Sequence, residues 1–325
     1  MHKLPEPISH QAILPWEESL LIKPIGIESP SISIVIPIFN AGAFIEKTIR
    51  SLLCNDMSGV ELILMDGGSG DSTMEIVDHY KQFFTVMHSA PDKGQSDAIN
   101  RGFEKASHHL LYWLNGDDLI LPNTLNVARE YFRDNAACDV LVGNAYMTEL
   151  DLSPINHFIY SPEKLTFDFL LDYASNHLVQ PSVFFTRKAW DKCGPVNNDY
   201  HYAMDADLFI GMAHEFTLHH LDQDIAYSVY HEDCKTKDAR AESITELAMV
   251  QAGHGGLAQA QNTLNILVDM YYQANAEPTS AQNQPLVSNN ECAKCKALEK
   301  RLSDLTETIE SNKRAYLEID MLEEA

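Results

Sequence analysis

Apolar residues in the N-terminal third of the chain fall into short continuous runs separated by stretches with helical spacing. Residues 31–36 form a β-branched run stopped by Pro37, and residues 60–65 form a second run, so both predict buried strands. Further elements are expected as helices at 43–54, 71–83 and 95–106 and as strands near 84–88 and at 109–114. This alternation predicts an α/β fold whose central sheet is mostly parallel and flanked by helices on both faces.

The same pattern divides the chain into five regions. Residues 1–30 are Pro-rich and aperiodic, and we expect them to form a lead-in segment that lies on a domain spanning residues 31–240. Residues 241–275 predict a C-terminal helical extension, and residues 276–291 form a polar linker. Within 292–325 the apolar residues approach heptad spacing, which is typical either of a packed helix or of an oligomerising coiled coil.

The charge balance narrows the class of protein. Lys and Arg number 23 against 47 Asp and Glu, which gives a formal net charge of −24. We do not expect so acidic a chain to bind nucleic acid through its phosphates.

No uncharged apolar stretch approaches the ~18 residues of a membrane span, and no signal-peptide pattern is present, so the sequence predicts a cytoplasmic protein. The six cysteines predict reduced thiols. The Cys292–Cys295 pair lacks the second pair that a zinc site needs, so it predicts inert thiols, with a zinc site shared between subunits as the alternative.

The turns after the predicted strands carry the chemistry, because ligands of open α/β sheets bind beyond the carboxyl ends of the strands. Asp117 and Asp118 follow an apolar strand, and two adjacent carboxylates repel each other unless a cation neutralises them. Hard oxygen ligands suit Mg²⁺ or Mn²⁺, and such an ion would stabilise a diphosphate as a leaving group. The alternative is a solvated turn with a helix cap before Pro122. The glycine turn after residue 65 is not a dinucleotide-binding fingerprint, because no G-x-G-x-x-G opens the next helix.

Four segments, taken in order, resemble glycosyltransferase family 2, in particular members that assemble bacterial polysaccharides. They read Ser-Ile-Val-Ile-Pro-Ile-Phe-Asn from Ser33, Asp-Gly-Gly-Ser-Gly-Asp-Ser-Thr from Asp66, Pro-Asp-Lys-Gly-Gln-Ser-Asp-Ala-Ile-Asn-Arg-Gly-Phe from Pro91, and Trp-Leu-Asn-Gly-Asp-Asp from Trp113. The resemblance covers residues 31 to about 240 and implies the GT-A fold, which is Rossmann-like. It also implies an enzyme that uses a nucleotide-diphosphate sugar as donor.

The resemblance assigns the nucleotide site residue by residue. Pro37, Phe39 and Asn40 would line the pocket of the base and ribose. Asp66 would lie beside the base, and Lys93 would approach the base or the phosphates. These residues follow three different predicted strands, so the resemblance implies that the fold brings them to one edge of the sheet.

The diphosphate and its cation are assigned in the same way. Asp97 belongs to the implied nucleotide-binding set, and Asp117 would face the ribose and the donor sugar. Asp118, the last acid of the family's DXD-type motif, would hold Mn²⁺ or Mg²⁺. His231 and Lys235 lie in a segment similar to His-x-x-Ser-Lys-Thr, where His231 would be a metal or diphosphate ligand and Lys235 a diphosphate partner. A purely structural role is the alternative for His231.

A second acidic segment, from Tyr202 to Leu208, resembles the family's Glu-Asp-x-x-Leu motif and implies a general base. Aligning Leu208 with the leucine of that motif puts Asp205 in the base position. Asp205 would take the proton from an acceptor hydroxyl as it attacks the anomeric carbon opposite the leaving nucleotide. Asp207 is the alternative base, and helix capping is the alternative role for Asp205. The sequence departs from the family at Gly67, where many relatives have an acid that contacts uracil.

These features predict an inverting, metal-dependent glycosyltransferase that moves a single sugar to a saccharide or lipid-linked acceptor in cell-surface polysaccharide synthesis. The processive-synthase motif Gln-x-x-Arg-Trp does not occur in the sequence, which favours single-residue transfer. A lipid-linked acceptor implies peripheral association with the inner face of the membrane, and the terminal heptads allow a homo-oligomer. One alternative is a catalytically degenerate GT-A domain that binds partners through its C-terminal helices. Another, a nucleotidyltransferase, predicts a basic Gly-rich loop near the N-terminus, which the sequence lacks.

Overall fold

The structure is a computed structural model and describes most of the chain up to residue 275. The described residues are 4–19, 22, 29–232, 234 and 239–275. The predictions for the polar linker, the terminal heptads, Lys235 and the Cys292–Cys295 pair lie outside these residues.

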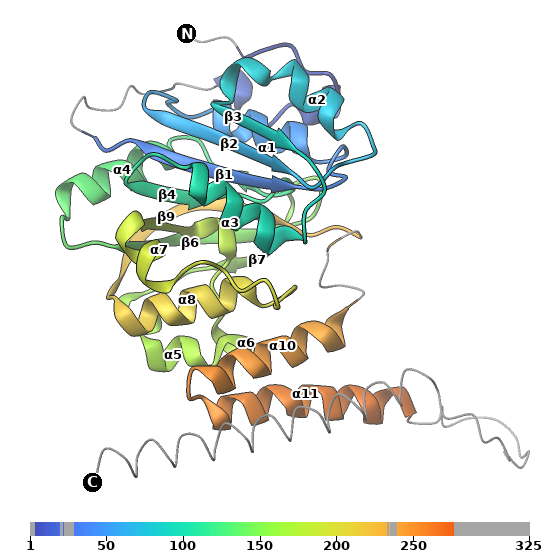
Figure 1. The fold of residues 1–325 in the computed structure, drawn as a ribbon, viewed down its shortest axis with the longest axis vertical. Helices are drawn as coiled ribbons and strands as arrows, with labels where there is room; N and C mark the ends of the chain where they lie inside the picture. The colour runs from blue at the N-terminus through green and yellow to red at the C-terminus, as the bar shows by residue number, and fades with distance from the viewer. Residues whose placement is uncertain (1–3, 20–21, 23–28, 233, 235–238, 276–325) are drawn as a thin grey trace, which may run out of the picture.

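One nine-stranded sheet runs through the molecule (Figure 1). Its strands are β1 (Ile32–Ile38), β2 (Val60–Asp66), β3 (Val86–Ser89), β4 (Leu110–Trp113), β5 (Leu119–Ile120), β6 (Val140–Thr148), β7 (Pro154–Phe158), β8 (Val183–Thr186) and β9 (Leu218–Val229). They lie in the order β3-β2-β1-β4-β8-β6-β9-β5, with β7 paired to β6. The block from β3 to β4 is parallel throughout, whereas β8 is antiparallel to both of its neighbours. The predicted α/β fold is confirmed.

Helices cover both faces of this sheet. They are α1 (Ile45–Leu53), α2 (Thr73–His79), α3 (Gln95–Lys105), α4 (Thr124–Asp134), α5 (Phe167–Leu171), α6 (Tyr173–Asn176), α7 (Arg187–Cys193) and α8 (Met204–Glu215). Alternate residues of β1 point to opposite faces, as in any strand. Ile34 and Ile36 pack with residues of α1, α2 and α4, whereas Val35 packs with residues of α3, α7 and α8. Both faces are therefore buried, which explains the continuous apolar runs in the sequence.

The helical extension consists of two helices that pack against each other at one end of the molecule. They are α10 (Arg240–Gly253) and α11 (Leu257–Asn275), and α10 also contacts α8 and α6 (Figure 1). Gly255 separates them with a φ of +85°, a left-handed conformation that ends helices and that glycine adopts without strain. In the part of the chain that the structure describes, no helix has the length and apolar character needed to cross a membrane.

The hydrophobic pattern does not predict strand β9. Its centre is polar, with His219, His220, Asp222 and Asp224 among its residues. The pairing of β9 with β6 shifts register between Gly143 and Ala145. A bulge of this kind breaks the two-residue period on which strand prediction relies.

Gly102 provides a test of how closely α3 packs on the sheet. A Cβ atom at this position would lie against Val35 Cγ1 and only 3.0 Å from Val35 Cγ2. Valine is stiff at χ1 and cannot give way easily. We expect Gly102→Ala to lower the free energy of unfolding by about 1–3 kcal/mol through overpacking. Urea unfolding measures this change.

Gly253→Ala is the matched control, because a Cβ atom there would meet no atom within 4 Å. The control is expected to leave the stability unchanged or to raise it slightly, since alanine favours the helix. Equal stability of Gly102→Ala and the parent protein would contradict the close packing of α3 on β1.

Candidate active site

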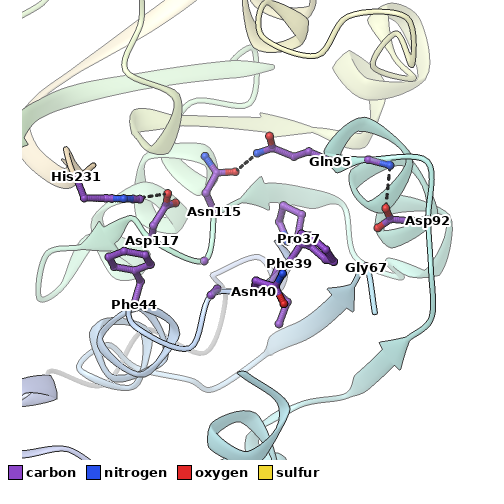
Figure 2. Close-up of a pocket in the computed structure, with 14 residues that line it drawn as sticks. Pro37, Phe39, Asn40, Phe44, Gly67, Asp92, Gln95, Asn115, Asp117 and His231 are labelled. Atoms are coloured by element: carbon purple, nitrogen blue, oxygen red, sulfur yellow. Dashed lines mark hydrogen bonds and ion pairs between the residues drawn. The ribbon is translucent and has the colours of Figure 1, made fainter. Parts of the chain in front are cut away.

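A cavity of about 860 Å³ opens at the carboxyl ends of β1, β2 and β4. Residues from segments far apart in the sequence line it, as Figure 2 shows. They are Pro37, Ile38, Phe39, Asn40, Ala41, Phe44, Gly67, Asp92, Gly94, Gln95, Asn115, Gly116, Asp117 and His231. This is the edge at which ligands bind in open α/β sheets, and a volume in this range suits a ligand larger than a monosaccharide.

Three of the residues predicted for the nucleotide, Pro37, Phe39 and Asn40, do line the cavity. The Phe39 side chain is 65% exposed, which leaves its ring face available to a ligand. Asn40 has a φ of +50°, and its N–H donates to Ser69 Oγ at 2.8 Å. Its Oδ1 accepts from Gly70 N at 2.9 Å, so Asn40 joins the turn after β1 to the turn after β2.

Asp66, predicted to lie beside the base, does not line the cavity. It is only 2% exposed, and its carboxylate accepts hydrogen bonds from Ser69 N, Ser69 Oγ and, at 2.6 Å, Ser89 Oγ. Asp66 therefore shapes the glycine turn, with its oxygens already engaged. Contact between Asp66 and a base stays a prediction that this geometry does not favour.

The other two predicted residues of the β3 side, Lys93 and Asp97, also lie outside the cavity lining. Asp97 forms an ion pair with Arg101 one helical turn later, at 3.6 Å, and accepts from Lys93 N at 3.3 Å. The Lys93 side chain is exposed near the cavity, because its neighbours Asp92 and Gly94 line it. Roles for Lys93 and Asp97 in nucleotide binding stay predictions.

Asp92 is the acid of this segment that lines the cavity, and the family resemblance assigns it no role. Its Oδ1 accepts from Gly94 N at 2.8 Å, which orients the carboxylate (Figure 2). A Cβ atom at Gly67 would lie 2.9 Å from Asp92 Oδ2. The Asp92 carboxylate therefore occupies the space that an acidic side chain at position 67 would need. In the sequence, Gly67 in place of the acid found in many relatives is the feature that could have indicated a role for Asp92.

Asn115 holds the turn after β4 in place. Its Oδ1 accepts from Trp113 Nε1 at 2.7 Å and from Gln95 Nε2 at 2.8 Å, and its Nδ2 donates to Asp118 Oδ2 at 3.2 Å. The last of these contacts orients one carboxylate of the Asp117–Asp118 pair, and the contact with Gln95 joins the turn to the first residue of α3.

Asp117 and His231 point toward each other in the cavity wall (Figure 2). Asp117 Oδ2 lies 3.1 Å from His231 Nε2. The His231 ring stacks on Phe44 with centroids 4.1 Å apart, and its Nδ1 is buried with no hydrogen-bond partner among the described residues. The predicted residues Asp117 and His231 are thus brought together from positions 114 residues apart in the sequence.

Asp118, the predicted metal ligand, is 4% exposed and does not line the cavity. Its Oδ1 accepts from Val229 N at 3.1 Å, which ties the turn after β4 to the end of β9. Burial, and then the charge of Asp117, raises the pKa of Asp118 well above the ordinary value of a carboxyl group. A nearby cation would favour the charged form of both acids. Direct metal binding by Asp118 stays a prediction, and the geometry favours Asp117.

The residues present fit a small divalent cation, but only in part. Two ligands at adjacent corners of an octahedral ion, each about 2.1 Å from it, lie about 3 Å apart. Asp117 Oδ2 and His231 Nε2 have this separation, which is also that of a hydrogen bond from Nε2 to the carboxylate, so an ion bound here would replace that proton. The described residues contain no cluster of three or more His, Cys, Asp or Glu side chains that could hold a metal by themselves. An ion here would need further oxygen ligands from a bound diphosphate or water, as is usual for Mg²⁺.

The two candidate bases lie in the first turn of α8, outside the cavity lining. Asp205 is half-buried, and its Oδ1 accepts from Ala206 N at 2.8 Å. Asp207 Oδ1 is 2.9 Å from His254 Nε2 of α10, so this carboxylate is engaged with another helix. Both carboxylates therefore have partners, and the choice of Asp205 as the base stays a prediction. The segment before α8 reaches the cavity wall, because Ser96 Oγ donates to Tyr200 O at 3.2 Å beside the cavity residue Gln95.

Residues 33–194 match the profile of the family described as Glycosyl transferase family 2. The chain belongs to this family. The predicted family and enzyme class are thereby confirmed.

Bacterial proteins are among the relatives of this family member. TuaG of Bacillus subtilis strain 168, named for teichuronic acid biosynthesis, is 28% identical over 142 residues, or 43% of this chain and 56% of TuaG. A PGL/p-HBAD biosynthesis glycosyltransferase of Mycobacterium bovis is 26% identical over 186 residues, or 56% of this chain and 69% of the relative. The chain thus spans little more than half the length of TuaG.

Solved structures show the same fold. TarS 1-349 of S. aureus superimposes with a TM-score of 0.56 and 15% identity, covering 77% of this chain and 76% of TarS. The mannosyltransferase PcManGT of Pyrobaculum calidifontis, solved with GDP-Man and Mn2+, gives a TM-score of 0.51 and 13% identity, covering 79% of each chain. TarS 1-349 has also been solved with UDP, and gives a TM-score of 0.55 at 16% identity over 75% of this chain and 72% of that one.

Proposed function

We propose that this family member transfers a single sugar from a nucleoside-diphosphate sugar to a saccharide or lipid-linked acceptor, with inversion at the anomeric carbon, in bacterial polysaccharide synthesis. The observation that carries the proposal is the cavity at the ends of β1, β2 and β4, which combines an exposed aromatic ring with a converging acid and histidine. The presence of UDP in one structural neighbour and of GDP-Man with Mn2+ in another supports a nucleotide sugar as ligand.

The nucleoside lies, in this proposal, on the side of the cavity formed by Phe39, Asn40, Gly67 and Asp92. Phe39 offers an apolar surface to the base. Asp92 Oδ2 is the acceptor nearest to Gly67, while Asp92 Oδ1 is used by Gly94 N. A carboxylate accepts hydrogen bonds, so it suits a base with an N–H on its pairing edge, which uracil and guanine have and cytosine and adenine lack at the ring nitrogen.

The diphosphate lies beside Asp117 and His231, which would hold Mn²⁺ or Mg²⁺. Bound there, the ion would neutralise the charge that builds up on the departing nucleoside diphosphate. The turn that carries Asp117 is anchored on both sides. The Asn115 side chain accepts from Gln95 Nε2, and the Asp118 side chain accepts from Val229 N. Phe44 packs on the His231 ring and keeps its orientation fixed.

The acceptor approaches from the side of α8. Asp205 takes the proton of the attacking hydroxyl, and the new glycosidic bond forms as the bond from the anomeric carbon to the diphosphate breaks. Attack from the face opposite the nucleotide inverts the anomeric centre in one step. Asp205 rather than Asp207 takes this role because its spacing to Leu208 matches the family's acidic motif.

Asp205→Asn tests the assignment of the base. We expect this variant to bind the nucleotide within about twofold of the parent protein, because Asp205 lies outside the cavity lining. Transfer should fall roughly 10²–10⁴-fold, the usual contribution of a general base. The measurements are sugar transfer in the presence of Mn²⁺ and nucleotide affinity by calorimetry. Asp207→Asn is the comparison variant and should retain most of the transfer. Undiminished transfer by Asp205→Asn would exclude Asp205 as the base.

Asp92→Asn tests recognition of the base. An amide presents a donor as well as an acceptor, so the variant loses a charged hydrogen bond to the N–H of uracil or guanine. We expect the affinity for UDP or GDP, whichever binds better, to fall roughly tenfold or more, whereas that for CDP and ADP should change far less. Glu104→Gln, at an exposed position of α3, is the matched control. An equal loss for all four nucleotides would contradict base recognition by Asp92.

A further inference from the structure

The segment that leads into α8 is held by a residue of the C-terminal extension. Three consecutive backbone N–H groups, those of His201, Tyr202 and Ala203, donate to the same oxygen of Glu246. The distances to Glu246 Oε2 are 2.8, 2.6 and 3.2 Å, respectively. Glu246 belongs to α10, so a contact across 43 to 45 residues of sequence fixes the start of α8.

The start of α8 has no side-chain cap at its N-cap position. The first turn of a helix leaves N–H groups without intrahelical acceptors, and a side chain at the N-cap position usually accepts from one of them. The N-cap residue of α8 is Ala203, which has no side-chain acceptor. A carboxylate supplies charge-assisted hydrogen bonds and is favoured at the positive end of the helix dipole. Glu246 does not replace such a cap, because it accepts from the N-cap residue Ala203 and from the two residues before it; it fixes the chain where that chain enters the helix.

Helix α10 is itself well anchored, so Glu246 acts from a fixed position. Gln251 is fully buried and donates through Nε2 to Leu171 O at 3.0 Å. His254 Nε2 lies 2.9 Å from Asp207 Oδ1, in the first two turns of α8. The extension thus contacts the N-terminal part of α8 at two places, on either side of the position of Asp205.

The opposite side of the same segment contacts the wall of the donor cavity. Tyr200 O accepts from Ser96 Oγ at 3.2 Å, and Asn100 forms two hydrogen bonds with the backbone of Val196, at 2.9 and 3.0 Å. Ser96 and Asn100 belong to α3, whose first residue, Gln95, lines the cavity. Residues 196–203 are therefore held between α3 and Glu246.

We propose that Glu246 is a positioning residue, which sets the first turn of α8, and with it Asp205, at the correct distance from the donor cavity. This inference rests on the proposed function, in which Asp205 is the base. It adds to that function a role for the C-terminal extension in the acceptor half of the reaction. Both Glu246 and the backbone that it holds lie beyond residue 194, where the match to the family ends.

Glu246→Ala and Glu246→Gln form the test. Alanine removes the acceptor of all three N–H groups, whereas glutamine keeps an oxygen that can accept from them. We expect kcat for sugar transfer to fall roughly 10- to 100-fold in Glu246→Ala, the effect of a small misplacement of a catalytic group. The affinity for the nucleotide and the KM for the donor should stay within about twofold, and Glu246→Gln should recover most of kcat. Asp78→Ala, which removes an exposed carboxylate of α2, is the control for the change of charge.

Amide hydrogen exchange supplies a readout that needs no activity. In Glu246→Ala the amides of residues 201–205 should exchange faster than in the parent protein, while those of β1 and β2 stay protected. Unchanged kcat or unchanged exchange at 201–205 would overturn the positioning role. A loss of nucleotide affinity parallel to the loss of kcat would also overturn it, because the defect would then extend to the whole domain.

The Asp205→Asn variant separates this proposal from the proposed function. An inactive Asp205→Asn together with a fully active Glu246→Ala contradicts only the positioning role. An active Asp205→Asn removes Asp205 as the base, and with it the catalytic role proposed for the Glu246 contact. Only a parent protein that transfers no sugar from any nucleotide-sugar donor would overturn the proposed function itself.

Discussion

Parallel pairing of β1 with β2 on one side and β4 on the other is the constraint on which the site depends. Because the three strands run in one direction, the turns that follow them meet at one edge of the sheet. Asn40 joins the turns after β1 and β2 through Ser69 and Gly70, and Asn115 joins the turn after β4 to the start of α3 through Gln95. Strand register and side-chain amides thus form the cavity and tie its walls together.

The acids at this edge divide into buried and cavity-facing residues. Asp66 and Asp118 are buried and bond to the protein, whereas Asp92 and Asp117 line the cavity. Buried carboxylates that accept hydrogen bonds keep the turns rigid. The cavity-facing ones keep oxygens available to a ligand. Of these four carboxylates, Asp66 and Asp118 therefore stabilise the turns. Asp92 and Asp117 remain for the proposed binding of the base and of the cation that accompanies the diphosphate.

The sequence predicts much of the fold and part of the site. Apolar runs and their spacing predict the parallel block and the convergence of its turns, and motif resemblance predicts that Asn40, Asp117 and His231 lie there, as they do. The sequence does not predict which of the acids point into the cavity. The partner that turns Asp118 away from the cavity is the backbone of Val229, 111 residues later, and periodicity carries no information about such contacts. The contact between Glu246 and the start of α8 is hidden for the same reason.

The central claim is that this cavity holds a nucleoside diphosphate together with a divalent cation. Crystals grown with Mn²⁺ and UDP or GDP test it most directly, because anomalous scattering locates manganese without ambiguity. We expect a manganese peak about 2.1–2.3 Å from both Asp117 and His231, with the base against Phe39 and the diphosphate completing the coordination. Manganese that contacts neither residue, or a nucleotide bound outside the cavity, would contradict it.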